Sequence, residues 1–357
     1  MVDNLEELRE RYKELRPKYE FLAISISNTL EAILKKNKIN YLTVENRVKT
    51  LDSFEEKIRR EDKDYKDPFK DMADFTGIRV ITYLEDEVAS VGRIIRKSFN
   101  THVEQSINKT EELGPDRFGY RSVHYICDIG RDREKLPESE PYKGLLFEIQ
   151  VRTLLQHAWA EIEHDRNYKF CGALPREIKR RFNSIAGLLE IADREFNSLA
   201  RDIEDYASDV KERIKNSDLS LDLDSKSIGY FLSHKGKIPG LNFLKKRVES
   251  RTPGQMDKVV KYLKKFGIKT LFELDEILTK EYLQLFRKHK CHYSDYRILN
   301  SAMLFADIDK FFSRCHNNRE GLSAISESTC KLLQEKYEKK KIDTILNKFN
   351  VKKVALA

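Results

Sequence analysis

The sequence predicts a mixed α/β fold, in which helices flank a β-sheet, followed by a small all-helical C-terminal domain. Two observations predict it. Between residues 41 and 215, segments of helical periodicity and segments of alternating hydrophobicity follow in the order helix, strand, helix, strand, strand, strand, helix. Beyond residue 228 only helical periodicity remains. With 357 residues, the chain is long enough for two domains.

The N-terminal residues 1–40 are expected to be helical. Residues 4–37 are amphipathic, and Pro17 is expected to break the first helix of this stretch. The following segment, YLTVENRVKT, reads as a short extended piece with Arg47 and Lys49 on the same side.

A capped helix is expected from Thr50 to about Arg60. The start of this helix brings Arg47, Lys49 and Lys57 close to a helix N-terminus, where free backbone amides also favour anions. For Lys57 taken alone, an ordinary basic helix surface is the preferred interpretation.

Two further strands and a helix follow a charged loop. Asp74 directly precedes the expected strand Ile78–Leu84, and Glu85–Phe99 has helical periodicity. We expect strands again at His102–Ile107 and Ser122–Ile129, separated by a loop that contains Gly and Pro.

The segment Leu146–Tyr168 shows a change of period. Phe147, Ile149 and Val151 alternate with polar residues, which predicts a strand with one buried face and one polar face. From Thr153 onward the apolar residues recur at helical spacing. The polar residues of this strand and helix include Glu148, Gln150, Arg152, His157, Glu161, His164 and Asp165.

The C-terminal third differs in charge from the rest of the chain. A long helix over residues 176–215 completes the expected domain 41–215, and residues 216–228 read as a linker. Residues 229–357 read as a basic helical domain, in which helices are expected at about 241–249 and 295–313, among others. Residues 221–357 hold 28 Lys and Arg against 16 Asp and Glu. This excess predicts a protein or RNA partner for the C-terminal domain, or else a solvated basic surface.

Composition excludes several classes of protein. No apolar run approaches the roughly 20 residues of a membrane span, and the first residues lack the apolar core of a signal peptide. The five cysteines form no CxxC pair, which suits a reducing compartment, so a cytoplasmic location without membrane contact is expected. A GxxxxGK[ST] motif is absent, which excludes a P-loop enzyme.

Paired carboxylates and surrounding cations predict phosphoryl-type chemistry. Asp74 and Glu148 could share one Mg²⁺, which commonly takes one or two protein carboxylates together with substrate phosphates. Basic side chains in the neighbouring segments would balance phosphate charge, and Tyr120, between a glycine and a strand, could stack on a base. These basic residues are Arg47, Lys49, Lys57, Arg79 and Lys109.

Four ordered motifs resemble the synthetase domain of RelA/SpoT-type alarmone synthetases, over roughly residues 40–200. The motifs are RVKTLDSFEEK, DFTGIRV, GYRSVHY and EIQVRTLLQHAWAEIEHDRNYK. The resemblance implies a nucleotidyltransferase-like mixed sheet. It also implies transfer of the β,γ-pyrophosphate of ATP to a ribose 3′-hydroxyl group, with release of AMP.

The resemblance also implies residue roles. Asp74 and Glu148 would hold Mg²⁺, Arg47 and Arg79 would sandwich the adenine of ATP, and Lys49, Lys57 and Lys109 would contact its phosphates. Tyr120 would stack on the acceptor base and His124 would lie beside the acceptor phosphates, with Arg117 a further candidate there. Gln150, Arg152, Glu161 and His164 would support the site. Glu148 is a candidate to accept the 3′-hydroxyl proton.

The acceptor stays open at this stage. By family it would be GDP or GTP, giving (p)ppGpp. His157, where many guanosine-using relatives carry an amide or an acid, and the sequence GPDRF before Tyr120 resemble small synthetases that include toxic members. For these, ADP, ATP or the 3′ end of tRNA are alternative acceptors. A non-catalytic nucleotide- or RNA-binding protein is the alternative of another class.

Overall fold

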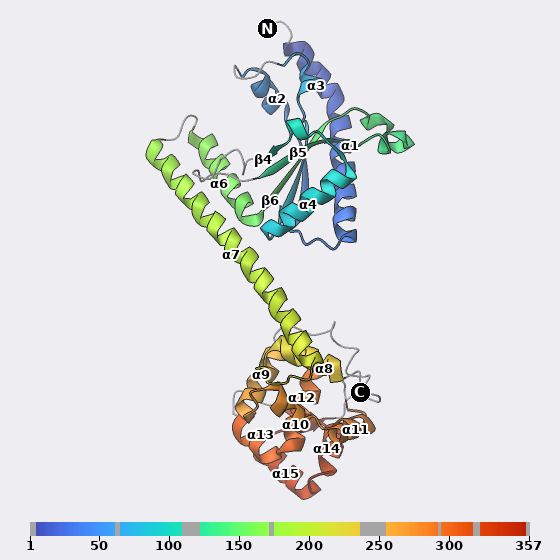
Figure 1. Cartoon of the computed structure of the whole chain (residues 1–357), viewed down its shortest axis with the longest axis vertical. Coiled ribbons are helices and arrows are strands. Elements are labelled where there is room, and N and C mark those ends of the chain that lie inside the picture. Colours follow the sequence, from blue (N-terminus) through green and yellow to red (C-terminus); the bar gives the residue numbers. More distant parts are fainter. Residues whose placement is uncertain are drawn as a thin grey trace. The chain divides into compact units, whose positions relative to one another are not determined.

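The computed structural model describes residues 5–60, 65–108, 122–170, 175–235, 255–291, 294–316 and 322–354. The chain forms two compact units, Met1–Arg201 and Asp202–Ala357 (Figure 1). In the described ranges, no helix has the length and apolar character needed to span a membrane.

The first unit is built on a mixed sheet, as predicted. Its strands are β1 (Thr43–Val48), β2 (Thr76–Thr82), β3 (Asn100–Thr101), β4 (Ile107–Asn108), β5 (Val123–Asp128) and β6 (Phe147–Thr153). Their order is β1-β2-β6-β5-β3, and β4 also pairs with β5. The central pair β2 and β6 is parallel, whereas every other pair is antiparallel.

One face of this sheet is apolar and lies under two helices, α1 (Leu5–Lys36) and α4 (Glu85–Ser98) (Figure 1). Ile78, Ile149 and Val151 from the sheet are fully buried against Leu30 of α1 and Ile95 of α4. The alternation of β2 and β6 therefore places every second side chain in this core and leaves the others on the opposite face.

The remaining helices begin in the first unit, and α7 continues into the second. They are α2 (Leu51–Ile58), α3 (Pro68–Asp71), α6 (Leu154–Phe170) and α7 (Arg176–Lys215), with the short 3-10 helices η2 (Val103–Gln105), η3 (Arg133–Lys135) and η4 (Pro137–Tyr142). The long helix expected over 176–215 is thus confirmed.

Helix α7 binds the end of β6 and the start of α4. The Thr153 hydroxyl donates to the buried Asp193 carboxylate at 2.6 Å. Asn197 accepts from the backbone amide of Asp86, and Arg201 makes a two-point ion pair with the Asp86 carboxylate. Burial raises the pKa of Asp193 to about 6.

The expected break at Pro17 is wrong, because α1 continues through it. Tyr12 and Tyr19, on either side of Pro17, are both buried in an aromatic cluster with Phe54 and Phe75. Packing on both sides of the proline outweighs the loss of one helical hydrogen bond.

The continuous strand expected at His102–Ile107 is also wrong. Two-residue strands, β3 and β4, flank the 3-10 helix η2 instead. The Ser106 hydroxyl and backbone amide both donate to the His102 carbonyl, which closes the turn. His102 Nε2 lies 2.8 Å from the Asp128 carboxylate, so this histidine has a structural partner.

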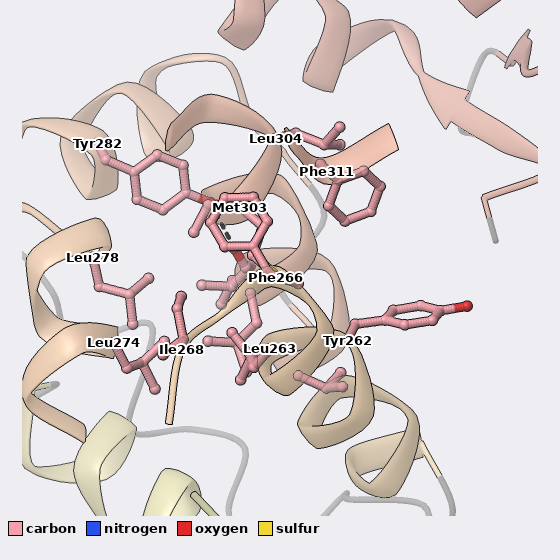
Figure 2. Packing of buried hydrophobic residues seen from close by; sticks show 14 of the residues in the cluster. Tyr262, Leu263, Phe266, Ile268, Leu274, Leu278, Tyr282, Met303, Leu304 and Phe311 are labelled. Carbon is pink, nitrogen blue, oxygen red and sulfur yellow. Dashed lines mark hydrogen bonds between the residues drawn. The ribbon is translucent and has the colours of Figure 1, made fainter. Parts of the chain in front are cut away.

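The second unit is helical, as predicted. Its helices are α8 (Ser225–Lys235), α9 (Gln255–Phe266), α10 (Leu271–Ile277), α11 (Lys280–Lys288), α12 (Asp295–Ala306), α13 (Ile308–Cys315), α14 (Glu327–Gln334) and α15 (Lys339–Lys348). Figure 2 shows part of its core, where Leu263 and Phe266 of α9 lie near Leu274 of α10 and Met303 of α12.

Three details of the second unit differ from the sequence-based expectation. Helix α8 begins at Ser225, inside the expected linker 216–228. The expected helix 295–313 divides at Asp307, whose side chain accepts from the Lys310 amide and so starts a new helix. Two short parallel strands, β7 (Ala324–Ser326) and β8 (Lys352–Val354), add a small sheet. The expected helix 241–249 lies outside the described residues.

Candidate active site

The face of the sheet opposite the apolar core carries polar side chains from four strands. The register places Arg47 opposite Gly77, Arg79 opposite Gln150, and Gln150 opposite His124. Because facing residues on neighbouring strands point to the same side, these side chains share one face. Glu148 and Arg152 lie on the same face, two positions either side of Gln150.

Asp74 lies just before β2 and is held by two lysines. Its Oδ2 atom is 2.7 Å from both Lys49 Nζ and Lys57 Nζ. Burial opposes ionisation of Asp74, but the two ammonium groups lower its pKa overall. Asp74 Oδ1 is buried and has no hydrogen-bond partner within the described ranges. One carboxylate oxygen is therefore left to accept a further cation or donor.

Glu148 forms the second acidic position, in the middle of β6. Its Oε1 lies 2.6 Å from His124 Nδ1, and its Oε2 accepts from Gln150 at 2.8 Å. His124 Nε2 in turn lies 2.5 Å from the Ser122 hydroxyl. Burial opposes ionisation of Glu148, but the His124 and Gln150 contacts lower its pKa overall, so it is an anion at neutral pH.

Repulsion between the two acidic groups acts in the opposite direction, since the Asp74 charge raises the pKa of Glu148. Asp74 lies just before β2 and Glu148 lies on β6, the strand paired with β2, so the two carboxylates come from neighbouring strands. Neither belongs to a group of three or more potential His, Cys, Asp or Glu ligands, and the described part of the chain holds no such group. Two carboxylates suit Mg²⁺, which fills its remaining positions with water and phosphate oxygens.

Helix α6 adds a third acidic group above the arginines. Glu161 Oε1 lies 3.0 Å from Arg79 Nη1 and 3.1 Å from Arg152 Nη2, and so joins β2, β6 and α6. His157, one turn earlier, lies 3.7 Å from the same oxygen. Burial and the two arginine charges lower the pKa of His157, so its imidazole is neutral at pH 7.

A pocket opens between β1, β2 and β6. It is lined by Glu45, Arg47, Gly77, Arg79 and Gln150, together with Asn46 and Ile78. A Cβ atom at Gly77 would lie 3.6 Å from Arg47 Cγ, so the aliphatic part of Arg47 extends over the glycine. Two guanidinium groups thus face one small pocket, a pattern able to hold a flat aromatic ring.

The structure brings together most of the predicted site residues that it describes. His164 is the exception, because it is exposed on α6 and makes no hydrogen bond or ion pair within the described ranges. Lys109, Arg117 and Tyr120 lie outside the described residues.

Two polar residues of the site were missed by sequence reasoning. Glu45 lies 3.7 Å from Arg79 and lines the pocket, and Ser122 contacts His124. Glu45 could have been predicted, because it lies two positions before Arg47 and therefore on the same face of β1. Ser122 carried none, since a serine before a strand is common.

Part of the chain matches a known protein family. Residues 46–172 match the region found in RelA / SpoT proteins. The chain is similar to the GTP pyrophosphokinase YjbM of Bacillus subtilis (strain 168), with 28% identity over 216 residues, 60% of this chain and 92% of that protein. It is similar to the GTP pyrophosphokinase YwaC of the same organism, with 22% identity over 57% of this chain and 97% of that protein.

Solved structures are similar over a comparable share of the chain. A GTP pyrophosphokinase family protein from Streptococcus pneumoniae is 28% identical and covers 55% of this chain and 96% of its own, with a TM-score of 0.47. Small alarmone synthetase 1 from Bacillus subtilis bound to its product pppGpp is 25% identical and covers 54% and 98%, also with a TM-score of 0.47.

Proposed function

Because residues 46–172 of this chain belong to the RelA/SpoT family, we propose that it transfers the β,γ-pyrophosphate of ATP to the 3′-hydroxyl group of GDP or GTP and releases AMP. The names of its relatives, GTP pyrophosphokinases, support this activity. The observation that carries the proposal is the polar face of the sheet, where Asp74 and Glu148 lie among lysines and arginines.

Asp74 and Glu148 would hold Mg²⁺. The buried Asp74 Oδ1 atom has no hydrogen-bond partner in the described part of the chain, which fits a carboxylate that accepts a cation. Bound there, Mg²⁺ would neutralise charge on the ATP phosphates and on the attacking oxygen.

Lys49 and Lys57 bind the ATP phosphates in this proposal. Both ammonium groups form ion pairs with the same atom, Asp74 Oδ2, and so lie close together. Lys49 directly precedes Thr50, whose side chain caps α2 by accepting from the Ser53 amide. The start of this helix therefore adds a positive end to the same region.

Arg47 and Arg79 hold the adenine ring between their guanidinium planes. The glycine between them on the sheet leaves the space that a flat ring needs. Glu161 and Glu45 contact Arg79 and keep its guanidinium in one orientation before ATP binds, which lowers the entropic cost of binding.

Glu148 accepts the proton of the 3′-hydroxyl group. It is an anion at neutral pH, and His124 and Gln150 fix both of its oxygens. The His124 imidazole, held by Ser122 on its other side, orients the carboxylate toward the polar face.

The test uses purified full-length protein, Mg²⁺ and ATP labelled at the γ-phosphate. GDP, GTP, ADP, ATP and bulk tRNA are offered separately, and products are resolved by chromatography and gel. Label in a guanosine nucleotide, with AMP formed in equal amount, is the expected result. Label in a new adenosine nucleotide product or in tRNA would contradict GDP or GTP as the acceptor but would still support pyrophosphate transfer.

Absence of label with every acceptor would contradict the enzymatic function when ATP is still bound. Equilibrium dialysis with labelled ATP decides this point in the same preparation. Binding without transfer would support a non-catalytic nucleotide-binding protein.

A further inference from the structure

The second unit contains a pocket that the proposed reaction does not use. It lies between α12 and β7 and is lined by Tyr296, Arg297, Asn300 and Leu304 of the helix and by the whole of β7. These helical positions are separated by one, three and four residues, so they form one face of α12. Its further lining residues are Ser301, Leu322, Ser323, Thr329 and Val354.

Asn300 is the unusual residue of this pocket. It is only 3% exposed, yet neither its Oδ1 nor its Nδ2 atom has a hydrogen-bond partner among the residues that the structure describes. A buried amide without partners is costly, and native proteins normally supply a ligand, a water molecule or another side chain for it. An amide that both donates and accepts matches a partner with the same two functions side by side.

Three other features of the pocket surround this amide. Arg297 makes no ion pair within the described residues, and it lies one turn before Asn300. Helix α14 begins at Glu327, after Ser326, whose side chain accepts from the Thr329 amide. Tyr296 contributes an aromatic ring, and Leu304, Ile325 and Val354 contribute apolar surface.

We propose that this pocket binds one nucleotide unit, a base with its phosphate, in the second unit of the chain. Asn300 would pair with the donor and acceptor edge of the base, as asparagine does with adenine. Tyr296 would stack on the ring, the apolar residues would cover its other surface, and Arg297 would bind the phosphate. A free mononucleotide and an unpaired nucleotide of an RNA share this chemistry.

The experiment measures binding of labelled AMP, GMP, CMP and UMP to the full chain by equilibrium dialysis. Arg47→Ala is used as the background, because it weakens the candidate ATP pocket of the first unit without touching the second. One mole of nucleotide per chain is expected in this background. An A-rich single-stranded RNA is tested in parallel, and tight binding of RNA with weak binding of mononucleotides would assign the RNA source.

Asn300→Leu is the decisive variant. Leucine has a similar volume and removes the unpaired polar atoms, so the unit should fold with equal or higher thermal stability. Binding should fall about tenfold or more in Asn300→Leu and in Arg297→Ala. Arg314→Ala, an exposed arginine of α13 outside the pocket, should bind as the background does.

Two results would overturn the proposal. If the Arg47→Ala background binds no mononucleotide and no RNA, ordered water alone forms the hydrogen bonds of the Asn300 amide. Equal binding by Asn300→Leu and its background would place any bound nucleotide elsewhere. Because the assay compares binding between Asn300→Leu and its background and does not measure pyrophosphate transfer, failure here leaves the pyrophosphate-transfer proposal untouched.

Discussion

The two faces of the sheet in the first unit are made by the same strands, but one forms the apolar core and the other carries the candidate active site. On one face, Ile149 and its neighbours are fully buried under α1 and α4. On the other, Gln150 donates to Glu148, Glu148 contacts His124, and Arg152 forms an ion pair with Glu161. We therefore expect substitutions on the buried face of β6 to lower mainly stability, and substitutions on its polar face to lower mainly activity.

The largest expected effect on stability comes from Ile149→Ala. This side chain is fully buried, and its truncation should lower the free energy of unfolding by about 2–5 kcal/mol. Urea denaturation monitored by circular dichroism measures it. Glu148→Gln, one residue away on the other face, is the comparison variant and should lower stability less than Ile149→Ala, because glutamine keeps an oxygen that can accept a hydrogen bond.

Glu148→Gln should instead lower pyrophosphate transfer by about 10²-fold or more, because it removes a charge that the reaction needs. Initial rates with γ-labelled ATP measure this, with ATP binding followed by dialysis. A variant that unfolds like Ile149→Ala would break the separation of the two faces. A fully active variant would remove Glu148 from the proposed chemistry.

Asp193→Asn tests the end of β6, where Thr153 donates to the buried carboxylate. The folded-state pKa of Asp193 is raised to about 6, so its ionisation costs stability as pH rises from about 4 through 6. The variant should therefore gain up to about 3 kcal/mol over the parent at pH 8 and nothing at pH 4.

Urea denaturation measures the stability of the variant relative to the parent at pH 4 and at pH 8. Only the change in this relative stability between the two pH values is assigned to Asp193. Asparagine keeps an oxygen that can accept from Thr153. An equal stability difference at both pH values would show that the carboxyl group does not titrate in this range.

The smallest effect is expected for Glu161→Gln. The Glu161 side chain is half exposed, so loss of its ion pairs should change the free energy of unfolding by less than about 1 kcal/mol. The KM for ATP should rise a few-fold because Arg79 loses its orienting partner. A rise in KM for the acceptor alone would place Arg79 on the acceptor side.

Period and residue type were enough to predict most of this face. The alternation in Phe147–Thr153 predicts both the core and the polar row, and the helix that follows carries Glu161 and His157 as expected. What the sequence lacked was distance information. Thr153 and Asp193 are forty positions apart, and nothing local marks them as partners.

Local rules failed where tertiary packing opposed them. Pro17 ends a helix by its own chemistry, but the burial of Tyr12 and Tyr19 keeps α1 continuous. The 3-10 helix at Val103–Gln105 depends on the Ser106 and His102 contacts, which periodicity does not reveal. In the second unit, the buried amide of Asn300 was not predicted, because the residue pattern shows neither its burial nor its lack of a hydrogen-bond partner in the described part of the chain.

The boundary between the two units falls between Arg201 and Asp202, inside α7. Asn197 and Arg201 bind the first unit, whereas Val210 and Ile214 are buried in the core of the second. A gene fragment with a stop codon near Asp218 would encode the first unit with two bare core residues of the second. Placing the stop codon just after Arg201 removes these two exposed apolar residues and should yield the more soluble recombinant fragment.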